Sequence, residues 1–332
     1  DPMLRSMYRS LVWTLLPDGS YVPLSDTNVD NSPSAHLLQL GAHRYPDLFA
    51  AVPLGIRTAR ASEFALFNLD AAAPQEAAPL ELPELLWPAW QTAILREAGS
   101  DGGSVATLAF NPEGGHRHTD NLALFYWHAG RSALGDLGYV GDMPLNRWIR
   151  SSLSHNLVVV DDAEQRFNGR KPELAFMAAT PLATVVEAYS DAYSMCEEYR
   201  RRVVMVKIGE TPFLIDIFRV RGGSKHAFRT YSEIAASDSE GGSLFFDGLE
   251  MPEEPPLPEV GASLAEADIF GLRDVRRAQP QGTWQATWHD DSGAFRLWMV
   301  SPCNAVEASN GPGQRKRSET GRRVRYVDAI RT

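Results

Sequence analysis

Residues 105–128 read VATLAFNPEGGHRHTDNLALFYWH, two apolar runs separated by a polar segment rich in glycine and histidine. The first run is Val105–Phe110 and the second is Leu122–Trp127. Both are short and contain the β-branched and aromatic residues that favour strands, and turn-forming residues lie between them. This stretch therefore predicts two strands joined by a loop.

Similar runs recur along the rest of the chain after about residue 90. Many short strands without intervening helices are typical of a large antiparallel β-sandwich. We expect this domain to occupy residues 86–332. The further runs are Gln91–Arg96, Leu157–Val160, Arg202–Ile208, Phe213–Val220, Trp284–His289 and Phe295–Val300.

The region before the strands has a helical period instead. Apolar residues from Leu4 to Leu15 recur at helical spacing and end before the turn residues that follow Leu16. Ser32 and Pro33 suit the start of a second helix. Residues 71–89, rich in Ala, Pro, Glu and Leu, read as a linker. The predicted fold class is thus α+β and multidomain, with a helical segment over residues 1–85.

Composition limits the class of protein. The chain has 332 residues, 44% of them hydrophobic, and a formal net charge of −10. This is globular composition, and no apolar run is long enough to span a membrane. An acidic chain is a poor general nucleic-acid binder. The two cysteines, Cys196 and Cys303, have no metal-binding or redox spacing, and the sequence leaves open whether they pair.

The negative charge is unevenly placed. Residues Glu233–Asp268 contain ten carboxylates and no Lys or Arg, and a basic segment, Arg315–Arg325, lies near the end of the chain. We expect both to be solvated surfaces or strand edges. The segment between Glu113 and His155 contains four carboxylates and four arginines, so its formal charge is balanced. The overall acidity therefore does not exclude an anionic polymer as a partner of this region.

Four of the eight histidines fall in one window, between positions 116 and 155. In an extended strand, His116, His118 and Asp120 would share one face, because side chains alternate. Asp136 lies between two glycines, and His155 precedes an apolar run. Two histidines and a carboxylate suit zinc or another divalent first-row ion. The alternative is a set of ordinary surface or hydrogen-bonded histidines.

The same window resembles the C-terminal half of the heparinase II/III-like polysaccharide lyases. The resemblance is carried by the string from Gly115 to Asp120, by Asp136-Leu-Gly138, and by His155-Asn156. Weaker matches are the turn from Leu16 to Asp26, and Asp216, Gly222-Gly223 and His226. The resemblance implies the C-terminal portion of an (α/α) toroid followed by a large antiparallel β-sandwich.

The resemblance also implies site residues. Zn²⁺ would be held by His118, Asp136 and His155. His116 would face the substrate cleft as a catalytic residue. Arg150 would contact a substrate carboxylate, with a structural ion pair as the alternative role, and Trp148 would stack on a sugar ring or else belong to the core.

The implied reaction is β-elimination in a uronic-acid-containing polysaccharide. In this family the catalytic Tyr and its Asn or His partner precede the Asp-Gly turn, which here is Asp18-Gly19. Only seventeen residues come before that turn, and Tyr8 reads as one position of a helix. We therefore expect the chain to be a C-terminal piece of a longer lyase that lacks the catalytic Tyr.

Two other functions remain open. A cupin-like metal oxygenase or isomerase would use His118, Asp120 and His155 as a two-His-one-carboxylate set. A non-catalytic, metal-stabilised carbohydrate-binding module would fit the missing Tyr. For the lyase we expect an acidic polysaccharide or oligosaccharide as the partner, and no nucleic acid. We expect no membrane span and a periplasmic or secreted location. A homodimer is compatible with this prediction. The identity of the polysaccharide and the choice between endo and exo cleavage are not encoded in any motif of the sequence.

Overall fold

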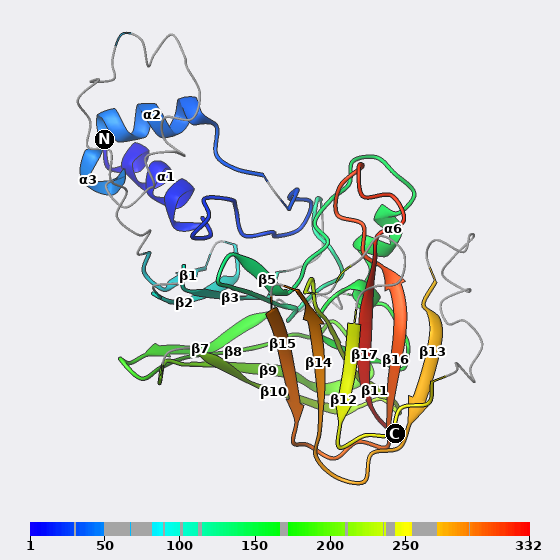
Figure 1. Cartoon of the computed structure of the whole chain (residues 1–332). Helices are drawn as coiled ribbons and strands as arrows, with labels where there is room; N and C mark the ends of the chain where they lie inside the picture. Colours follow the sequence, from blue (N-terminus) through cyan, green and yellow to red (C-terminus); the bar gives the residue numbers. More distant parts are fainter. Residues whose placement is uncertain are drawn as a thin grey trace.

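The computed structural model describes residues 1–29, 31–49, 67, 82–88, 90–99, 102–111, 115–166, 172–209, 212–234, 236, 243–253, 271–291 and 293–332. Every structural statement concerns these residues. Among them, three helices come first in the chain and seventeen strands follow (Figure 1). All strand pairs in the four sheets that they form are antiparallel. The predicted antiparallel β fold is confirmed.

The helices are α1 (Pro2–Trp13), α2 (Ala35–Arg44) and α3 (Pro46–Phe49). Helix α2 begins after Ser34, so the start predicted at Ser32 was two residues early. Val12, Leu38 and Phe49 are fully buried where the three helices pack together. The toroid implied by the resemblance is not shown by these three helices and stays a prediction.

Two sheets face each other at the start of the strand region. The first contains β1 (Leu85–Trp87), β2 (Thr92–Glu97), β3 (Ser104–Ala109), β4 (Leu124–His128) and β5 (Arg131–Leu134), in chain order. The second has the order β10-β9-β8-β7 and lies below the first in Figure 1. Its strands are β7 (Glu173–Ala179), β8 (Ala183–Tyr189), β9 (Cys196–Val206) and β10 (Phe213–Gly222).

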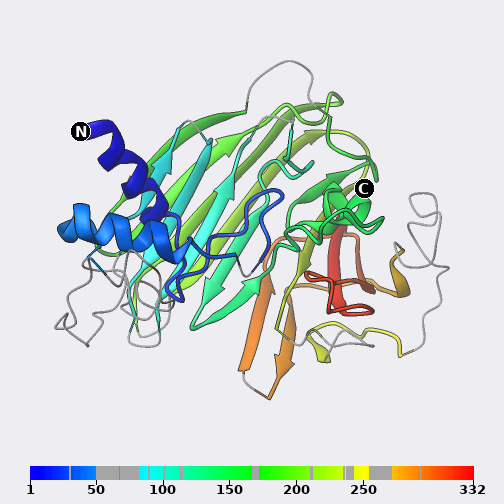
Figure 2. The same cartoon turned by 90° about the horizontal axis from the view of Figure 1, so that it is seen from above.

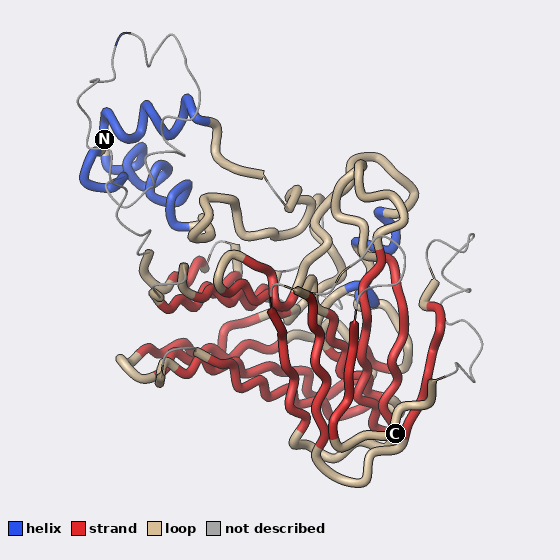
Figure 3. The backbone as a smooth tube through the Cα atoms, viewed as in Figure 1, coloured by secondary structure: helices blue, strands red, loops and turns tan. Residues whose placement is uncertain are grey.

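Two further sheets complete the strand region, as the red segments of Figure 3 show. One has the order β13-β16-β17-β11-β6, with strands Arg273–Ala278, Ala305–Pro312, Arg323–Arg331, His226–Tyr231 and Val158–Val160. The other has the order β12-β14-β15, with strands Ser243–Asp247, Trp284–Asp290 and Gly293–Met299. A short helix, α6 (Asn146–Ile149), and a 3₁₀ turn (Ser152–Ser154) lie between β5 and β6.

All four sheets contribute to one apolar core. It includes Leu108 of β3, Val203 of β9, Trp288 of β14 and Val327 of β17, each almost fully buried. Burial of this many apolar side chains is the main stabilising contribution to such a domain.

The first sheet is also covered on its outer face. Leu16 and Val22, which follow α1, pack against Ile94, Val105 and Trp127. This explains why β2 and β3 read as continuous apolar runs, because strands buried on both faces lose the alternation of a half-exposed strand. In Figure 2 the helices and this segment lie across the sheet.

The segment before β2 and the two cysteines differ in how well the sequence predicts them. Leu85–Trp87, which we expected in a linker, is instead a strand paired with Thr92–Ile94, and residues 71–81 lie outside the described residues. Cys196 and Cys303 are both free thiols. No described helix has the length and apolar character needed to cross a membrane.

Candidate metal centre and active site

Three connections between strands bring the histidine window together. His118 lies between β3 and β4, Asp136 follows β5 directly, and His155 precedes β6. The segment from His116 to Asp120 lies in the loop predicted between the two apolar runs, and it does not form the extended strand that would place the three side chains on one face. The backbone N–H of Thr119 donates to the carbonyl of Arg150 (2.9 Å), which fixes the loop against the α6 region.

The loop separates the two histidines of the His-x-His pair. The His116 side chain is 93% exposed, whereas that of His118 is fully buried. The exposed ring is available to an external molecule, and the buried ring belongs to the interior of the site.

His118, Asp136 and His155 form a buried cluster. Nδ1 of His118 lies 3.3 Å from Nε2 of His155, and Oδ2 of Asp136 lies 3.8 Å from the same Nε2. One donor atom from each residue lies within 4.8 Å of the other two. Two imidazole nitrogens and one carboxylate oxygen at such separations can converge on a single ion.

The surrounding hydrogen bonds orient these donor atoms. Nδ1 of His155 donates to the carbonyl of Ser151 (2.8 Å), which leaves the Nε2 lone pair facing the cluster. Nε2 of His118 lies 3.1 Å from Oδ1 of Asp26, which leaves Nδ1 facing the cluster. Oδ1 of Asp136 accepts from the N–H of Gly138 (2.7 Å), so Oδ2 is the free oxygen. Such outer contacts are the usual way in which proteins set the tautomer of a metal-binding histidine.

The charges around the cluster also suit a cation. Burial raises the pKa of the Asp136 carboxyl, and the nearby Asp120 raises it further, while His155 and His118 act in the opposite direction. Oδ2 of the buried Asp120 lies 3.8 Å from Nε2 of His155. Two buried carboxylates next to two imidazoles are costly without positive charge, and a divalent ion would supply it. The donor set therefore fits Zn²⁺.

Asp26 joins this cluster to the exposed part of the site. Its Oδ2 lies 3.0 Å from Nδ1 of His116, while its Oδ1 lies 3.1 Å from Nε2 of His118. The guanidinium of Arg150 approaches the same Oδ1 at 3.9 Å and donates to the carbonyls of Gly115 (3.2 Å) and Arg117 (3.1 Å). Arg150 therefore fixes the loop that carries His116, and part of its side chain remains exposed.

In the sequence, Asp26 stands only at the end of a turn, and no motif marks it as a site residue. The residue lies 90 positions from His116 in the chain, so no local pattern links the two. Its buried carboxylate, only 9% exposed, becomes visible as a site residue only in the folded chain.

The model for the family "Heparinase II/III-like, C-terminal" matches residues 94–299, more than half of the chain. The chain belongs to this family. The matched residues contain His116, His118, Asp136 and His155, but not Asp26. No curated protein shows significant sequence similarity to the chain.

Solved structures of heparinase-type lyases share the fold. The heparan sulfate lyase HepC from Pedobacter heparinus has 13% identity and a TM-score of 0.58, covering 99% of this chain and 44% of its own. A structure of heparinase III has 14% identity and a TM-score of 0.53, covering 99% and 48%. The chain thus spans less than half the length of either lyase.

Within this heparinase II/III-like domain, Trp148 is placed differently from the expectation. It is 3% exposed and packs edge-to-face against Tyr326, with ring centroids 5.9 Å apart. The ring is buried in the same apolar cluster as Val324 and Leu137, so it has almost no exposed surface on which a sugar could stack. Its burial favours the core role over the stacking role.

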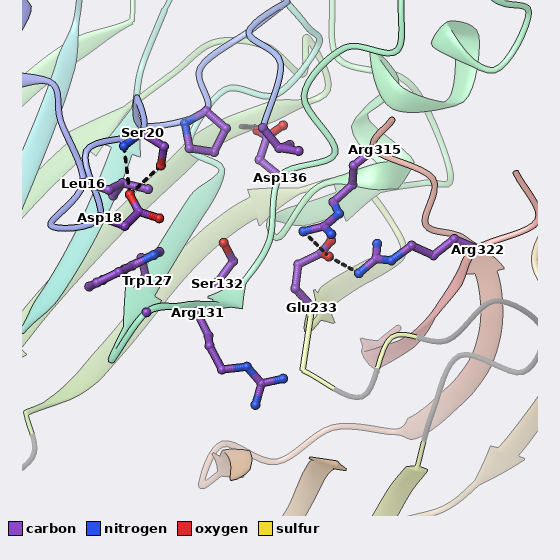
Figure 4. Close-up of a pocket in the computed structure, with 13 residues that line it drawn as sticks. Leu16, Asp18, Ser20, Trp127, Arg131, Ser132, Asp136, Glu233, Arg315 and Arg322 are labelled. Carbon is purple, nitrogen blue, oxygen red and sulfur yellow. Dashed lines mark hydrogen bonds and ion pairs between the residues drawn. The ribbon is translucent and has the colours of Figure 1, made fainter. Parts of the chain in front are cut away.

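The domain also contains a pocket of about 290 Å³ beside the cluster of His118, Asp136 and His155 (Figure 4). Asp136 lies in its wall, together with residues of the turn after α1, of the β4–β5 hairpin and of the β16–β17 connection. Glu233, which we expected on a solvated acidic surface, is buried here and ion-paired with Arg322 and Arg315. That expectation was wrong for Glu233, because its carboxylate pairs with two arginines of the basic segment.

Proposed function

We propose that this chain forms part of a polysaccharide lyase that cleaves a uronic-acid-containing polymer by β-elimination, with Zn²⁺ in its β-sandwich. The observation that carries the proposal is the convergence of His118, Asp136 and His155, with His116 exposed at the edge of the same site. Membership of the heparinase II/III-like family supports the lyase class. A periplasmic or secreted location and an acidic polysaccharide as partner follow from the same proposal.

His118, Asp136 and His155 would hold the zinc. When bound, the ion supplies a fixed positive charge that ties three strand connections together and shapes the wall of the site. The role of Asp26 is to keep Nδ1 of His118 directed at the cluster, while Ser151 does the same for Nε2 of His155.

The exposed residues suit the chemistry of elimination. The C5 proton of a uronate becomes removable when hydrogen bonds or positive charge neutralise the adjacent carboxylate. A base then takes this proton, a C4–C5 double bond forms, and the O4 leaving group receives a proton from an acid. In this proposal His116, oriented by Asp26, would donate to the carboxylate or move a proton, and the partly exposed Arg150 would bind a carboxylate.

The tyrosine that the resemblance calls for is not assigned to this chain. Tyr8 packs against the rings of Tyr45 and Phe49, with centroids 5.6 Å and 5.9 Å away, as one position of the helical core. This packing supports a structural role for Tyr8. With Tyr8 in a structural role, a metal-stabilised carbohydrate-binding module is the second candidate function.

The test is incubation of the protein, including any segment that precedes this chain, with heparan sulfate, heparin, hyaluronan, chondroitin and alginate while the ultraviolet absorbance of unsaturated uronate is followed. We expect absorbance to rise with at least one polymer and His116→Ala to lower kcat/KM by at least about 100-fold, the usual effect of losing an acid–base group. Zinc content should be unchanged in that variant. A matched control is His289→Ala, on the exposed side of β14.

Two outcomes would count against the lyase. If no polymer gives unsaturated product while sugar binding persists, the binding module is the better function. If His116→Ala is as active as the unmodified chain, His116 has no part in the reaction.

A further inference from the structure

Strand β10 lies at one end of the second sheet, and it is the longest of the described strands that end a sheet (Figure 1). Its ten residues, Phe213–Gly222, pair with β9 on one side. Among the described residues, no strand pairs with its other side. A free edge presents unpaired backbone N–H and C=O groups, so a long free edge is a template for pairing with another chain.

Most of the other sheet edges in the described part of the chain have features that discourage such pairing. Strands β1, β5 and β6 have only three or four residues, and β7 and β13 contain a register shift. In β10 the register shift comes only after Arg221. The segment Phe213–Phe218 is therefore regular, and its one charged residue, Asp216, is already paired with Arg201. Short length, bulges and exposed charge are the usual protection of an edge, and this segment has none of them.

The side chains of this segment that point away from the core are apolar. Leu214 packs against the core, so the alternate residues Phe213, Ile215 and Ile217 lie on the outer face of the sheet. They are 49%, 43% and 43% exposed, respectively. Two valines of β9 lie opposite the first two and extend the apolar surface. An exposed apolar surface that continues over neighbouring strands is typical of a protein interface.

The spacing of these residues makes the edge complementary to itself. If two copies of β10 pair antiparallel about a two-fold axis at Ile215, each Ile215 lies opposite the other and Phe213 lies opposite Ile217. Aromatic and β-branched side chains directly opposite each other stabilise a strand pair. On the inner face Asp216 lies opposite Leu214, so no two charges of this segment face each other. A two-fold interface uses the same patch on both subunits, which favours a second copy as the partner.

Neighbouring registers fit less well. An axis at Asp216 would place two carboxylates directly opposite each other, which is destabilising. An axis at Ile217 would place Ile215 opposite the charged Arg219. The register centred on Ile215 therefore combines the largest number of apolar pairs with no opposed like charges.

The arginines beside this segment do not prevent the approach of a second copy. Arg200, Arg202 and Arg219 lie on the same outer face, and all three contact the buried carboxylate of Glu187. Because these guanidinium groups share a counter-charge within the sheet, two copies do not bring unpaired cations together.

We propose that β10 forms a symmetric interface between two copies of this protein, through antiparallel pairing of Phe213–Phe218 about a two-fold axis at Ile215. The second sheets of the two copies then form one continuous sheet across the dimer. None of the interface residues belongs to the cluster of His118, Asp136 and His155, so the inference does not depend on the lyase reaction.

The first test is analytical ultracentrifugation of the protein, including any segment that precedes this chain, over a wide range of concentrations. We expect a reversible equilibrium between monomer and dimer. Ile215→Lys should raise the dissociation constant at least about tenfold, because it removes two apolar side chains from the interface and places two ammonium groups opposite each other. Phe245→Lys is the matched control, since Phe245 of β12 is 60% exposed on another sheet.

The second test locates the axis. Ile215→Cys should form a disulfide between two copies on mild oxidation, because directly opposite residues of an antiparallel pair have Cβ atoms about 4.5–5.5 Å apart. Arg221→Cys, on the same face of the same strand but far from the axis, should not. The unmodified protein shows the background from Cys196 and Cys303. Mixing Ile215→Lys with Ile215→Glu should restore a dimer that contains one copy of each.

The outcomes decide between this interface and other ones. A protein that is monomeric at all concentrations overturns the proposal, and so does a dimer that Ile215→Lys weakens no more than Phe245→Lys does. A disulfide in Arg221→Cys without one in Ile215→Cys contradicts the two-fold axis at Ile215. If Ile215→Lys alone loses its fold, judged by circular dichroism, the cysteine variants still decide the question.

Discussion

Asp26 has a carboxylate whose two oxygens serve two histidines with different environments. One oxygen orients the buried His118, and the other contacts the exposed His116. A single side chain therefore orients both a candidate metal ligand and an exposed histidine ring. The exposed and the buried histidine are thus linked through a residue that is distant from both in the chain.

We predict that Asp26→Asn lowers zinc affinity by about 10- to 100-fold, the usual effect of removing the outer partner of a ligand. The amide keeps the size of the side chain but loses the charge that favours one tautomer of His118. Zinc affinity is measured by competition with a chromophoric chelator. Asp47→Asn is the control, since Asp47 pairs with Arg5 on the exposed surface of the helices. Equal zinc affinity in both variants would show that Asp26 does not orient a zinc ligand.

The sequence predicts the residues of the site better than their surroundings. His118, Asp136 and His155 were chosen from motifs, and folding brings the three together. Trp148 was chosen because an aromatic residue near a sugar site can stack, but the sequence does not distinguish a buried ring from an exposed one. The sequence predicts an exposed Glu233, because it begins a run of carboxylates without Lys or Arg. Its arginine partners, Arg315 and Arg322, lie more than 80 residues away in the chain, so no local pattern reveals the buried ion pairs.

Strand β9 shows how one residue connects an element to the site. Arg201 is buried and donates to both oxygens of Asp216 on β10 (2.9 and 2.5 Å). It also donates to the carbonyls of Leu122 and Asn156 (both 2.6 Å), the second of which follows His155 directly. The second sheet thus supports the backbone next to His155, a candidate metal ligand.

We predict that Arg201→Ala lowers the free energy of unfolding by about 3 to 5 kcal/mol, because it leaves a carboxylate and two carbonyls without their charged donor. Arg221→Ala is the control, since its ion pair with Glu197 is largely exposed. Such a surface pair contributes about 0 to 1 kcal/mol. Chemical denaturation of both variants measures the difference, and a loss in Arg201→Ala no larger than in Arg221→Ala would contradict the prediction.

The connection from β10 to β11 gives a prediction with a pH dependence. The backbone N–H groups of Lys225 and Ser224 donate to Asp161 (2.8 Å each) and hold the pKa of its carboxyl below the usual value. A lowered pKa in the folded state means stability that is present above the unfolded value of about 3.9 and is lost as pH falls through the folded value.

We therefore expect Asp161→Asn to destabilise the protein by about 1 kcal/mol at pH 7, a hydrogen-bond contribution reduced by solvent exposure, and by less below about pH 4. Asn tolerates the left-handed backbone at this position (φ 53°), so the variant isolates the charge. Asp162→Asn, which removes only the partner of the Lys225 ammonium, is the comparison. Thermal unfolding at several pH values measures both, and a destabilisation that does not shrink at low pH contradicts the assignment.

Some strands can be predicted from their sequence pattern and others cannot. The eight runs named from the sequence each overlap a strand, because they are dense in Val, Ile, Leu and aromatic residues. Nine of the described strands lie outside these runs, and β16 is one example, since Ala305–Pro312 contains Glu, Ser, Asn and Gly and is stabilised as an inner strand of its sheet. Strand β1 has only three residues and is defined by its pairing with β2. Tertiary pairing overrides composition in both cases.

At the scale of the whole molecule, the candidate metal site joins parts that are distant in the chain. Its ligands come from three connections within the sandwich, and Asp26 comes from the segment that covers the first sheet. Arg96 of β2 attaches this segment by donating to the carbonyl of Trp13 (2.9 Å). Occupation of the site should therefore stabilise more than one region.

We predict that zinc at 100 times its Kd adds about 2.7 kcal/mol to the free energy of unfolding. For a chain of this size that corresponds to a rise in melting temperature of about 4 °C. Asp136→Asn should abolish the rise, and magnesium should not reproduce it, because magnesium prefers oxygen ligands. Differential scanning calorimetry with and without a chelator measures the shift. An equal rise in the Asp136→Asn variant would place the zinc elsewhere.

The position of β17 has a consequence for the order in which the chain is made. This last strand lies between β16 and β11, so the sheet is incomplete until it arrives. Arg322, just before it, pairs with Glu233, which was synthesised 89 residues earlier. At ordinary translation rates this interval is roughly 5 to 20 s. During that time β11 has an open edge on a ribosome-bound chain and the pocket lacks a wall, so early release or a stalled ribosome would leave an aggregation-prone intermediate.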